Sequence, residues 1–256
     1  PKERAMVSVD DRGFLLSDGL YEGRPAYNGR LFRMEHHMGR LRHGLDALRI
    51  EFDTSGLTEI HQRLLAENGL ESEDVSIVYL QITRGAAPRT HHFPPEGTPP
   101  TVYAFAQAYH RPESARWEQG YEAVTVPDDR WARVDIKSIG LLPNVLAQQA
   151  AAEAGVADAL LVKDGVALEG SHNNLFAVFD GVVTTHPATH QILHGVTRAY
   201  VIELAKGQGL PVEERPVPLE EIRAADEIFF TGTTTEVRPT VRLDGQPVGR
   251  GKVGPV

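Results

Sequence analysis

The 256-residue chain contains no cysteine. This absence excludes disulfide bonds, a thiolate nucleophile and a zinc site built from thiolates, and it fits a reducing compartment. Basic residues are also scarce, because 26 Lys and Arg stand against 35 Asp and Glu, for a formal net charge of −9. Binding along a phosphate backbone needs a basic surface. The composition therefore predicts no nucleic-acid partner.

Long hydrophobic runs are absent too. No segment reaches the roughly 18 apolar residues of a membrane span, and residues 1–4 do not begin like a signal peptide. The sequence therefore predicts a cytoplasmic protein without a membrane partner. His186, His190 and His194 are spaced four apart, as metal ligands on a helix would be, but Pro187 predicts a loop there. No metal site is expected.

What is present predicts an α+β protein, because strands outnumber helices and many strands are joined as hairpins. Three hairpin turns are marked by Asn28-Gly29, Asp164-Gly165 and Asp180-Gly181. A Pro- and Gly-containing stretch predicts a linker at 111–120, between a small N-terminal α+β domain at 1–110 and a larger C-terminal domain at 121–256. The predicted strands are 20–26, 30–34, 75–83, 102–108, 159–162, 166–168, 175–179, 182–185 and 227–231. The predicted helices are 35–50, 57–68, 143–155 and 196–206.

Lys137 is the first candidate for catalysis. Val134 and Ile136 alternate with Arg133, Asp135 and Lys137, which predicts a half-buried strand that ends at Lys137. Desolvation favours the neutral form of an amine, and a neutral amine can attack a carbonyl to form a Schiff base. A single lysine at a strand end is more often a surface cation, so both interpretations remain open.

Glu169 is the second candidate. The hairpin at 159–168 is predicted to deliver Glu169 and Gly170 into the loop at 171–174. A carboxylate opposite the nitrogen of a lysine-bound pyridoxal ring keeps that nitrogen protonated and makes the ring an electron sink. A glutamate in a turn is more often a solvated rim residue.

Three further stretches contain groups that bind anions. Val196 and Thr197 open a helix after Gly195, where free backbone N–H groups can bind phosphate, although Thr197 is also an ordinary helix-start residue. The hydroxyls of Thr231–Thr235 could do the same or could only cap a turn. Arg89 and His91 lie two positions apart on an extended loop, so they can clamp a carboxylate, and the alternative is a solvated basic loop.

Taken together, the motifs resemble a known family. In order along the chain they are DIKSIGLLPNVLAQQAA, LEGSHNNLFAV, THP, ILHGVTRAYV, ADEIFFTGTTTEV and LDG. They are similar in sequence and spacing to fold-type IV pyridoxal-phosphate enzymes, and most similar to D-amino acid transaminases. The resemblance covers nearly the whole chain. It implies two domains, an N-terminal α/β sandwich and a C-terminal β-barrel-like domain.

The resemblance also implies a cofactor and roles for individual residues. The cofactor is pyridoxal 5'-phosphate, Lys137 and Glu169 are catalytic, and Leu193 packs on the ring. A tyrosine at Tyr21, with Arg89 and His91 from the neighbouring subunit of a homodimer, would bind the substrate α-carboxylate. The implied phosphate contacts are Arg40, Val196, Thr197 and Thr233. Periodicity alone does not distinguish Arg40 from Arg42.

The implied reaction moves an amino group through a Schiff base, between D-amino acids such as D-alanine or D-glutamate and 2-oxo acids such as pyruvate or 2-oxoglutarate. Two departures bear on the substrate: His172 replaces a serine, and Gly23-Arg24-Pro25 resembles branched-chain aminotransferases. The alternatives are a branched-chain L-aminotransferase, an aminodeoxychorismate lyase, an (R)-amine transaminase and a non-catalytic protein that binds the cofactor.

Overall fold

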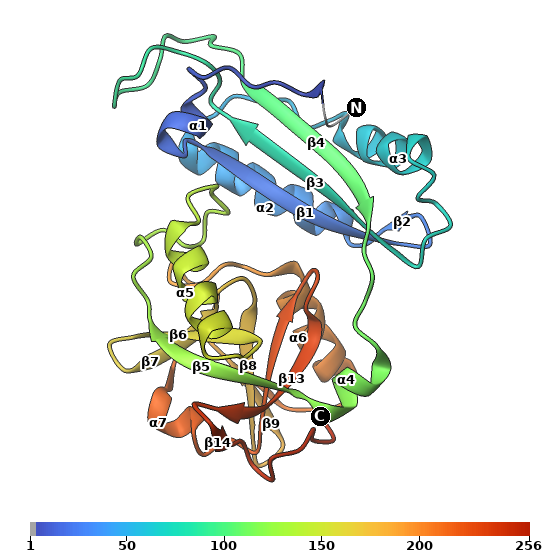
Figure 1. Cartoon of the computed structure of the whole chain (residues 1–256), viewed down its shortest axis with the longest axis vertical. Helices are drawn as coiled ribbons and strands as arrows, with labels where there is room; N and C mark the ends of the chain where they lie inside the picture. Colours follow the sequence, from blue (N-terminus) through green and yellow to red (C-terminus); the bar gives the residue numbers. More distant parts are fainter. Residues whose placement is uncertain (1–3) are drawn as a thin grey trace. The chain divides into compact units, whose positions relative to one another are not determined.

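The computed structural model describes residues 4–256 and divides into two compact units (Figure 1). Unit 1 runs to His110 and also includes Ile136–Gly140, and unit 2 comprises Arg111–Asp135 and Leu141–Val256. The predicted boundaries place Lys137 in the C-terminal domain, whereas its segment is part of unit 1, where Ile136 is buried in the core. None of the described helices is long and apolar enough to cross a membrane.

Unit 1 contains a four-stranded antiparallel sheet in the order β2-β1-β3-β4. The strands are β1 (Gly19–Tyr27), β2 (Arg30–Leu31), β3 (Val75–Thr83) and β4 (Thr101–Ala108). The hairpin predicted at Asn28-Gly29 is confirmed, because both residues have the positive φ angles, 47° and 74°, that its tight turn requires. Proline at position 25 is tolerated because β2 pairs with β1 only at Ala26 and Tyr27.

Two helices cover one face of this sheet. They are α2 (Met34–Leu48) and α3 (Leu57–Glu67), close to the predicted ranges, and the short α1 (Arg12–Leu16) precedes β1. Their apolar side chains pack on Leu20 of β1 and on Leu80 and Ile82 of β3. Because strand side chains alternate, Leu20, Glu22 and Arg24 share the covered face, while Tyr21 lies on the opposite one.

The covered face also buries a cluster of charged side chains. Arg40 on α2 donates to both Glu22 oxygens, with distances of 2.7 and 2.8 Å, and His37 Nδ1 lies 2.9 Å from the same carboxylate. Burial raises the pKa of Glu22, but the charge and hydrogen bonds of Arg40 and His37 lower it well below the usual value. Arg24, fully buried, is bonded to Nε2 of His61 on α3.

Unit 2 is built on a sheet that closes on itself. Strands β8, β12, β13, β5, β6 and β7 pair in that order, and the pairing of Glu169 in β7 with Asn174 in β8 completes a ring of six strands. This closed sheet confirms the predicted barrel-like domain. Most pairs are antiparallel, while β13–β5, β5–β6 and β10–β9 are parallel.

The elements of unit 2 follow the predicted hairpins and helices, with additions. The strands are β5 (Tyr121–Pro127), β6 (Asp158–Lys163), β7 (Val166–Gly170), β8 (Asn174–Phe179), β9 (Val182–Thr185), β10 (Val212–Glu214), β11 (Val217–Pro218), β12 (Glu227–Gly232), β13 (Glu236–Leu243) and β14 (Gln246–Pro247). The helices are α4 (Ser114–Gln119), α5 (Leu142–Glu153), α6 (Val196–Gly207) and α7 (Leu219–Ile222). Helix α4 occupies much of the stretch predicted as a linker.

Two local predictions are wrong. The segment from Trp131 to Lys137 is not a strand: it consists of turns and bends, followed by a single bridge from Ser138 to Leu20. Alternation suggested a strand, but Val134 bonds to His190 in unit 2 while Ile139 bonds to Gly19 in unit 1, so no continuous ladder forms. The sequence also predicts that Glu169 leaves the hairpin for the loop at 171–174, whereas it lies within β7 and is only 3% exposed.

The buried His61 should make the folding stability of the protein sensitive to acid. Burial and the neighbouring Arg24 charge lower the pKa of His61 from 6.5 to about 4. Below pH 6.5 the unfolded chain takes up a proton that the folded chain excludes, so stability falls as the pH is lowered from about 6.5 to about 4. The loss from this one group is on the order of 3 kcal/mol.

We expect the His61→Gln variant to lose less unfolding free energy between pH 7 and pH 4.5 than the parent protein. Denaturant titrations at both pH values measure the difference, and NMR of the His61 ring should show no titration above pH 5. Equal losses in the two proteins would contradict the assignment.

Candidate active site

Glu169 is a buried carboxylate surrounded by donors. Its oxygens accept hydrogen bonds from Arg130 Nη1 at 2.5 Å, from Asn174 Nδ2 at 2.7 Å and from the Leu193 N–H at 3.1 and 3.2 Å. Burial raises the pKa of Glu169, and the positive charge of Arg130 opposes that shift. Because these partners all donate, the ionised carboxylate is the form that the hydrogen bonds fit.

Arg130 has no counterpart among the residues predicted from the sequence. Its guanidinium donates to Asp128 at 2.8 and 2.9 Å as well as to Glu169, so one buried cation holds two carboxylates. The Asp128-x-Arg130 spacing is a local signal for the first pair, but nothing in the sequence indicates the second. That contact depends on the closed sheet, which brings Glu169 to a residue 39 positions earlier in the chain.

The hydrogen bonds of Glu169 lead directly to the start of α6. Asn174 Nδ2 also donates to the Leu193 carbonyl at 2.9 Å, and the same carbonyl accepts the Gly195 N–H at 2.9 Å. Gly195 is the N-cap of α6, and a Cβ atom at this position would overlap Asn174 Oδ1. Glycine is therefore required for the helix start to approach Asn174. The structure thus brings together the predicted residues Glu169, Leu193 and Val196.

The start of α6 and the threonine turn supply groups suited to an anion. No side chain caps α6 within the described chain, so the first N–H groups, including those of Val196 and Thr197, lack a capping side chain. Thr233 lies in the turn between β12 and β13. Asn173 Nδ2 reaches Thr235 Oγ1 in this turn at 3.5 Å, which links the turn to the loop after Glu169.

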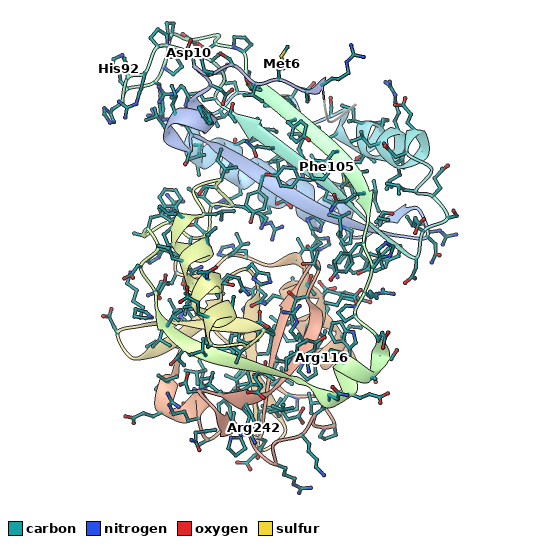
Figure 2. All side chains as sticks on the ribbon, in the orientation of Figure 1. Met6, Asp10, His92, Phe105, Arg116 and Arg242 are labelled. Carbon is teal, nitrogen blue, oxygen red and sulfur yellow. The ribbon has the colours of Figure 1, made fainter. Side chains whose placement is uncertain are left out.

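In unit 1, Lys137 lies beside Tyr21. The Lys137 ammonium is 4.2 Å from the centroid of the Tyr21 ring, and the Tyr21 N–H donates to the Lys137 carbonyl at 3.1 Å. Tyr21 in turn stacks on Tyr79, with ring centroids 5.8 Å apart. Tyr79 stacks on Phe105 of β4, which Figure 2 labels. The uncovered face of the sheet therefore carries a row of aromatic rings with Lys137 at one end.

Arg40 and Arg42 are distinguished by the structure. The Arg40 side chain is only 8% exposed and is oriented by Glu22, whereas the Arg42 side chain is 52% exposed and has only a distant contact with Glu35. An arginine held in place at the inner side of a helix is better suited to bind an anion in a fixed position. This supports Arg40 as the predicted residue.

Arg89 and His91 are both exposed, on the loop between β3 and β4. His92, the next residue along the loop, is labelled in Figure 2. The structure brings neither Arg89 nor His91 into hydrogen-bond contact with Tyr21 or Lys137 within the described part of unit 1, and both side chains are available at the surface of the chain.

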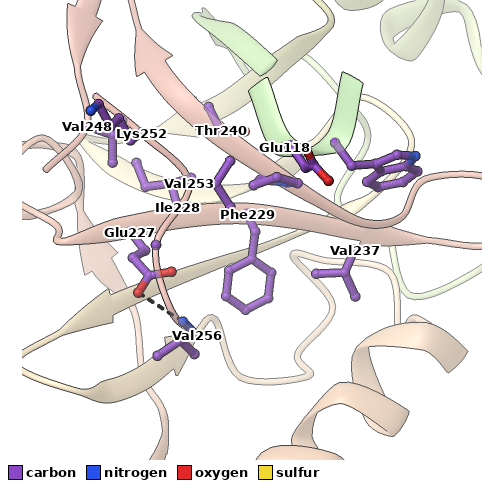
Figure 3. Close-up of a pocket in the computed structure, with 13 residues that line it drawn as sticks. Glu118, Glu227, Ile228, Phe229, Val237, Thr240, Val248, Lys252, Val253 and Val256 are labelled. Carbon is purple, nitrogen blue, oxygen red and sulfur yellow. Dashed lines mark hydrogen bonds between the residues drawn. The ribbon is translucent and has the colours of Figure 1, made fainter. Parts of the chain in front are cut away.

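A pocket of about 330 Å³ lies elsewhere in unit 2 (Figure 3). Its wall includes Phe229, Val237 and Val253, and the Glu227 carboxylate in it accepts the Val256 N–H at 3.2 Å. None of the predicted site residues lines this pocket. Its walls are largely apolar and hold no converging set of catalytic side chains, so the pocket is separate from the candidate active site.

Comparison with known proteins identifies the family to which this chain belongs. The family model of the amino-transferase class IV matches residues 19–243. D-alanine aminotransferase of Staphylococcus epidermidis is 38% identical over 257 residues, which cover 100% of this chain and 90% of that protein. D-alanine aminotransferase of Bacillus licheniformis is also 38% identical, over 255 residues that cover 100% of this chain and 89% of that protein. The chain belongs to the class IV aminotransferases.

Solved structures agree with this assignment. Branched-chain amino acid aminotransferase of Escherichia coli has a TM-score of 0.89 and 28% identity, covering 99% of this chain and 86% of that one. A second branched-chain amino acid aminotransferase, solved with pyridoxamine 5'-phosphate, also has a TM-score of 0.89 and 28% identity, covering 100% of this chain and 86% of that one. The fold-type IV architecture expected from the motifs is therefore confirmed.

The residues of this aminotransferase fit pyridoxal 5'-phosphate, the cofactor of its class. A buried carboxylate whose hydrogen-bond partners are all donors suits a protonated ring nitrogen, and the uncapped start of α6 suits a phosphate. The two features lie in one unit and are joined through Leu193, whose N–H binds Glu169 and whose carbonyl binds the N-cap Gly195. The donor set thus matches both ends of the cofactor.

We expect Arg130→Met to destabilise the aminotransferase by about 3–5 kcal/mol, because it leaves two buried carboxylates without their cation. Adding Glu169→Gln should recover part of that loss, since an amide carries no charge to leave unpaired. Urea unfolding of the cofactor-free proteins measures both effects.

Arg133→Met is the matched control. Arg133 also pairs with an aspartate two positions away, Asp135, but its side chain is 48% exposed, so its removal should change the unfolding free energy by less than about 1 kcal/mol. Equal effects of Arg130→Met and Arg133→Met would contradict the buried-pair interpretation.

Proposed function

We propose that this aminotransferase moves the amino group of a D-amino acid, with D-alanine as the first candidate, to a 2-oxo acid such as 2-oxoglutarate. Two relatives named D-alanine aminotransferase match the full chain at 38% identity, above the 28% of the branched-chain enzymes. The observation that carries the proposal is the exposed Arg89-x-His91 pair on the loop between β3 and β4, because a guanidinium and an imidazole can together bind an α-carboxylate.

Each residue has a distinct role in this proposal. Lys137 binds the cofactor through its amine, Glu169 holds the ring nitrogen protonated, and Leu193 packs against the ring. The start of α6 at Val196 and Thr197, together with Arg40 and Thr233, binds the phosphate. When bound, pyridoxal 5'-phosphate supplies an electron sink that stabilises the negative charge left on the substrate Cα atom.

Lys137 also serves as the base that accepts the proton from the substrate Cα atom. Its position beside Tyr21 supports this role, since the aromatic ring limits where the amine can swing, and the Tyr21–Lys137 backbone bond fixes the segment. Tyr21, Arg89 and His91 hold the α-carboxylate, which orients the Cα–H bond toward the base. The same steps in reverse aminate the 2-oxo acid.

The branched-chain alternative loses one of its supports. Its sequence motif included Arg24, but Arg24 is fully buried on the face of β1 that α2 and α3 cover, where it bonds to His61. Tyr21 lies on the opposite face. Arg24 therefore stabilises the core of unit 1, and its presence does not select an L-amino acid.

We further propose that the enzyme is a homodimer. Three large apolar side chains on α5, Leu142, Val145 and Leu146, are 69%, 59% and 62% exposed. The opposite side of α5 packs through Ala147 and Ala151. A helix that is apolar on both sides is typical of an interface, and a second copy would bring the exposed Arg89 and His91 to a neighbouring site.

The first test adds D-alanine or L-leucine to the enzyme loaded with pyridoxal 5'-phosphate and follows the visible cofactor absorption and 2-oxo acid formation. We expect D-alanine to change the spectrum and produce pyruvate, and L-leucine to have little effect. A response to L-leucine alone would move the assignment to the branched-chain class, and no response to either would favour a protein that only binds the cofactor.

Lys137→Ala should reduce turnover by at least about 10³-fold, because it removes both the cofactor bond and the base. Lys163→Ala is the control, since Lys163 is an exposed lysine at the end of β6. If Lys137→Ala kept full turnover with the cofactor bound, the assignment of the lysine would be wrong.

Leu146→Glu should shift the enzyme from dimer to monomer in sedimentation velocity and lower its activity, because a charge would have to be buried in the interface. Ile60→Glu, on the exposed side of α3, is the control and should stay dimeric. An active wild-type monomer would contradict the proposal.

A further inference from the structure

The loop between β3 and β4, residues 84–100, carries the pair proposed to bind the substrate carboxylate. A long loop is normally mobile, and ordering it on substrate binding would weaken the affinity. This loop, however, contacts other parts of unit 1 at several points. These contacts give residues other than Arg89 and His91 a part in holding the loop.

The central bond comes from Arg12 on α1. Arg12 is 3% exposed, its Nε donates to Asp18 Oδ2 at 2.8 Å, and its Nη1 donates to the Thr90 carbonyl at 2.8 Å. Thr90 is the residue between Arg89 and His91. A hydrogen bond to the middle carbonyl fixes the backbone of the pair while both flanking side chains remain exposed.

A second attachment lies just after the pair. The Phe93 ring packs against two guanidiniums, with Arg84 Cζ 3.7 Å and Arg49 Cζ 4.6 Å from its centroid. Arg84 is itself held by hydrogen bonds, because it donates to both oxygens of Asp18, at 2.8 and 3.0 Å, and to the Leu48 carbonyl at 2.7 Å. Cation–π contacts of this kind hold an otherwise exposed ring in place.

The base of the loop is fixed as well. The Arg12 N–H donates to the Gly85 carbonyl at 2.9 Å, and the Ala87 N–H donates to the Asp10 carbonyl at 3.1 Å. Gly85 has a φ of +92°, and a Cβ atom there would overlap the Pro99 carbonyl, so the two ends of the loop are held against each other. The attachments therefore surround the Arg89–His91 segment on both sides.

We propose that Arg12 and Phe93 are positioning residues that hold the Arg89–His91 pair ready for the substrate carboxylate. This role rests on the proposed D-amino acid function, in which Arg89 and His91 bind the substrate carboxylate. Arg12 does not bind the substrate itself, because its charge is paired with Asp18 and it is buried. By ordering the loop before the substrate arrives, Arg12 lowers the entropy that the loop would otherwise lose on substrate binding.

The test compares Arg12→Gln and Phe93→Leu with the parent holoenzyme. We expect amide hydrogen exchange at residues 86–93 to become about tenfold faster, and KM for D-alanine to rise about tenfold with kcat within about threefold, because a lost ordering of the binding loop weakens ground-state and transition-state binding equally. Arg12→Lys should give intermediate values, since an ammonium lacks the fork that reaches both Asp18 and Thr90. Because Phe93 is 42% exposed, Phe93→Leu should fold normally. It therefore still tests the anchoring if Arg12→Gln fails to fold.

Arg242→Gln is the matched control. Arg242 Nη1 also donates to a loop carbonyl, that of Gly245, at 2.7 Å, but in unit 2. Its loss should change neither exchange at 86–93 nor KM. Arg89→Ala sets the upper limit for the KM effect, because it removes the carboxylate contact directly.

Each result decides one part of the inference. Unchanged exchange in both variants would overturn the anchoring, and faster exchange with unchanged KM would overturn its link to the carboxylate. If the wild-type enzyme did not turn over D-alanine, the proposed function and the positioning role would both fail. The hydrogen-exchange rates would still show whether Arg12 and Phe93 hold the loop, so failure of the proposed function and failure of the anchoring can be told apart.

Discussion

A carboxylate that is taken out of water must be matched by fixed donors, and this constraint governs the structure. Arginines fix carboxylates in both units: the buried Glu169 is paired with Arg130 and the buried Glu22 with Arg40, while the partly buried Asp18 is shared by Arg12 and Arg84. Removing Arg130 or Arg40 would leave an uncompensated charge in a low dielectric. The backbone around each pair is therefore held in a single arrangement.

The three pairs support three parts of the proposed chemistry. The pair in unit 2 fixes the carboxylate proposed for the ring nitrogen, and the Glu22–Arg40 pair orients the arginine proposed for the phosphate. The Asp18 cluster holds the loop with the proposed carboxylate-binding residues. Fixed charges of this kind do not have to reorganise during a reaction, which is the main physical advantage of building a site from them.

In unit 1, the alternation of side chains along β1 separates the buried ionic residues from the proposed substrate-binding tyrosine. Glu22 and Arg24 point to the face that α2 and α3 cover, so they form buried bonds, while Tyr21 points to the uncovered face beside Lys137. A shift of one residue in the register of β1 would exchange these two sets. The full-length pairing of β1 with β3, from Gly19–Thr83 to Tyr27–Val75, prevents that shift.

The sequence by itself determined most elements and the family. Hairpins marked by Asn-Gly and Asp-Gly and helices marked by apolar periodicity depend on neighbouring residues, so local patterns predict them. The motif order predicts the class, which the family match confirms. The individual site residues remain a prediction, supported by the geometry of each unit.

Only the tertiary structure decided the irregular path of Lys137, the burial of Glu169 and the role of Arg130. Alternation predicted a strand at Val134 and Ile136, but the chain divides its hydrogen bonds there between two units. Glu169 is buried because β7 closes the ring of six strands, and its partner Arg130 lies 39 residues away. Contacts between distant parts of a chain depend on how sheets close and helices pack, and a local pattern does not contain that information.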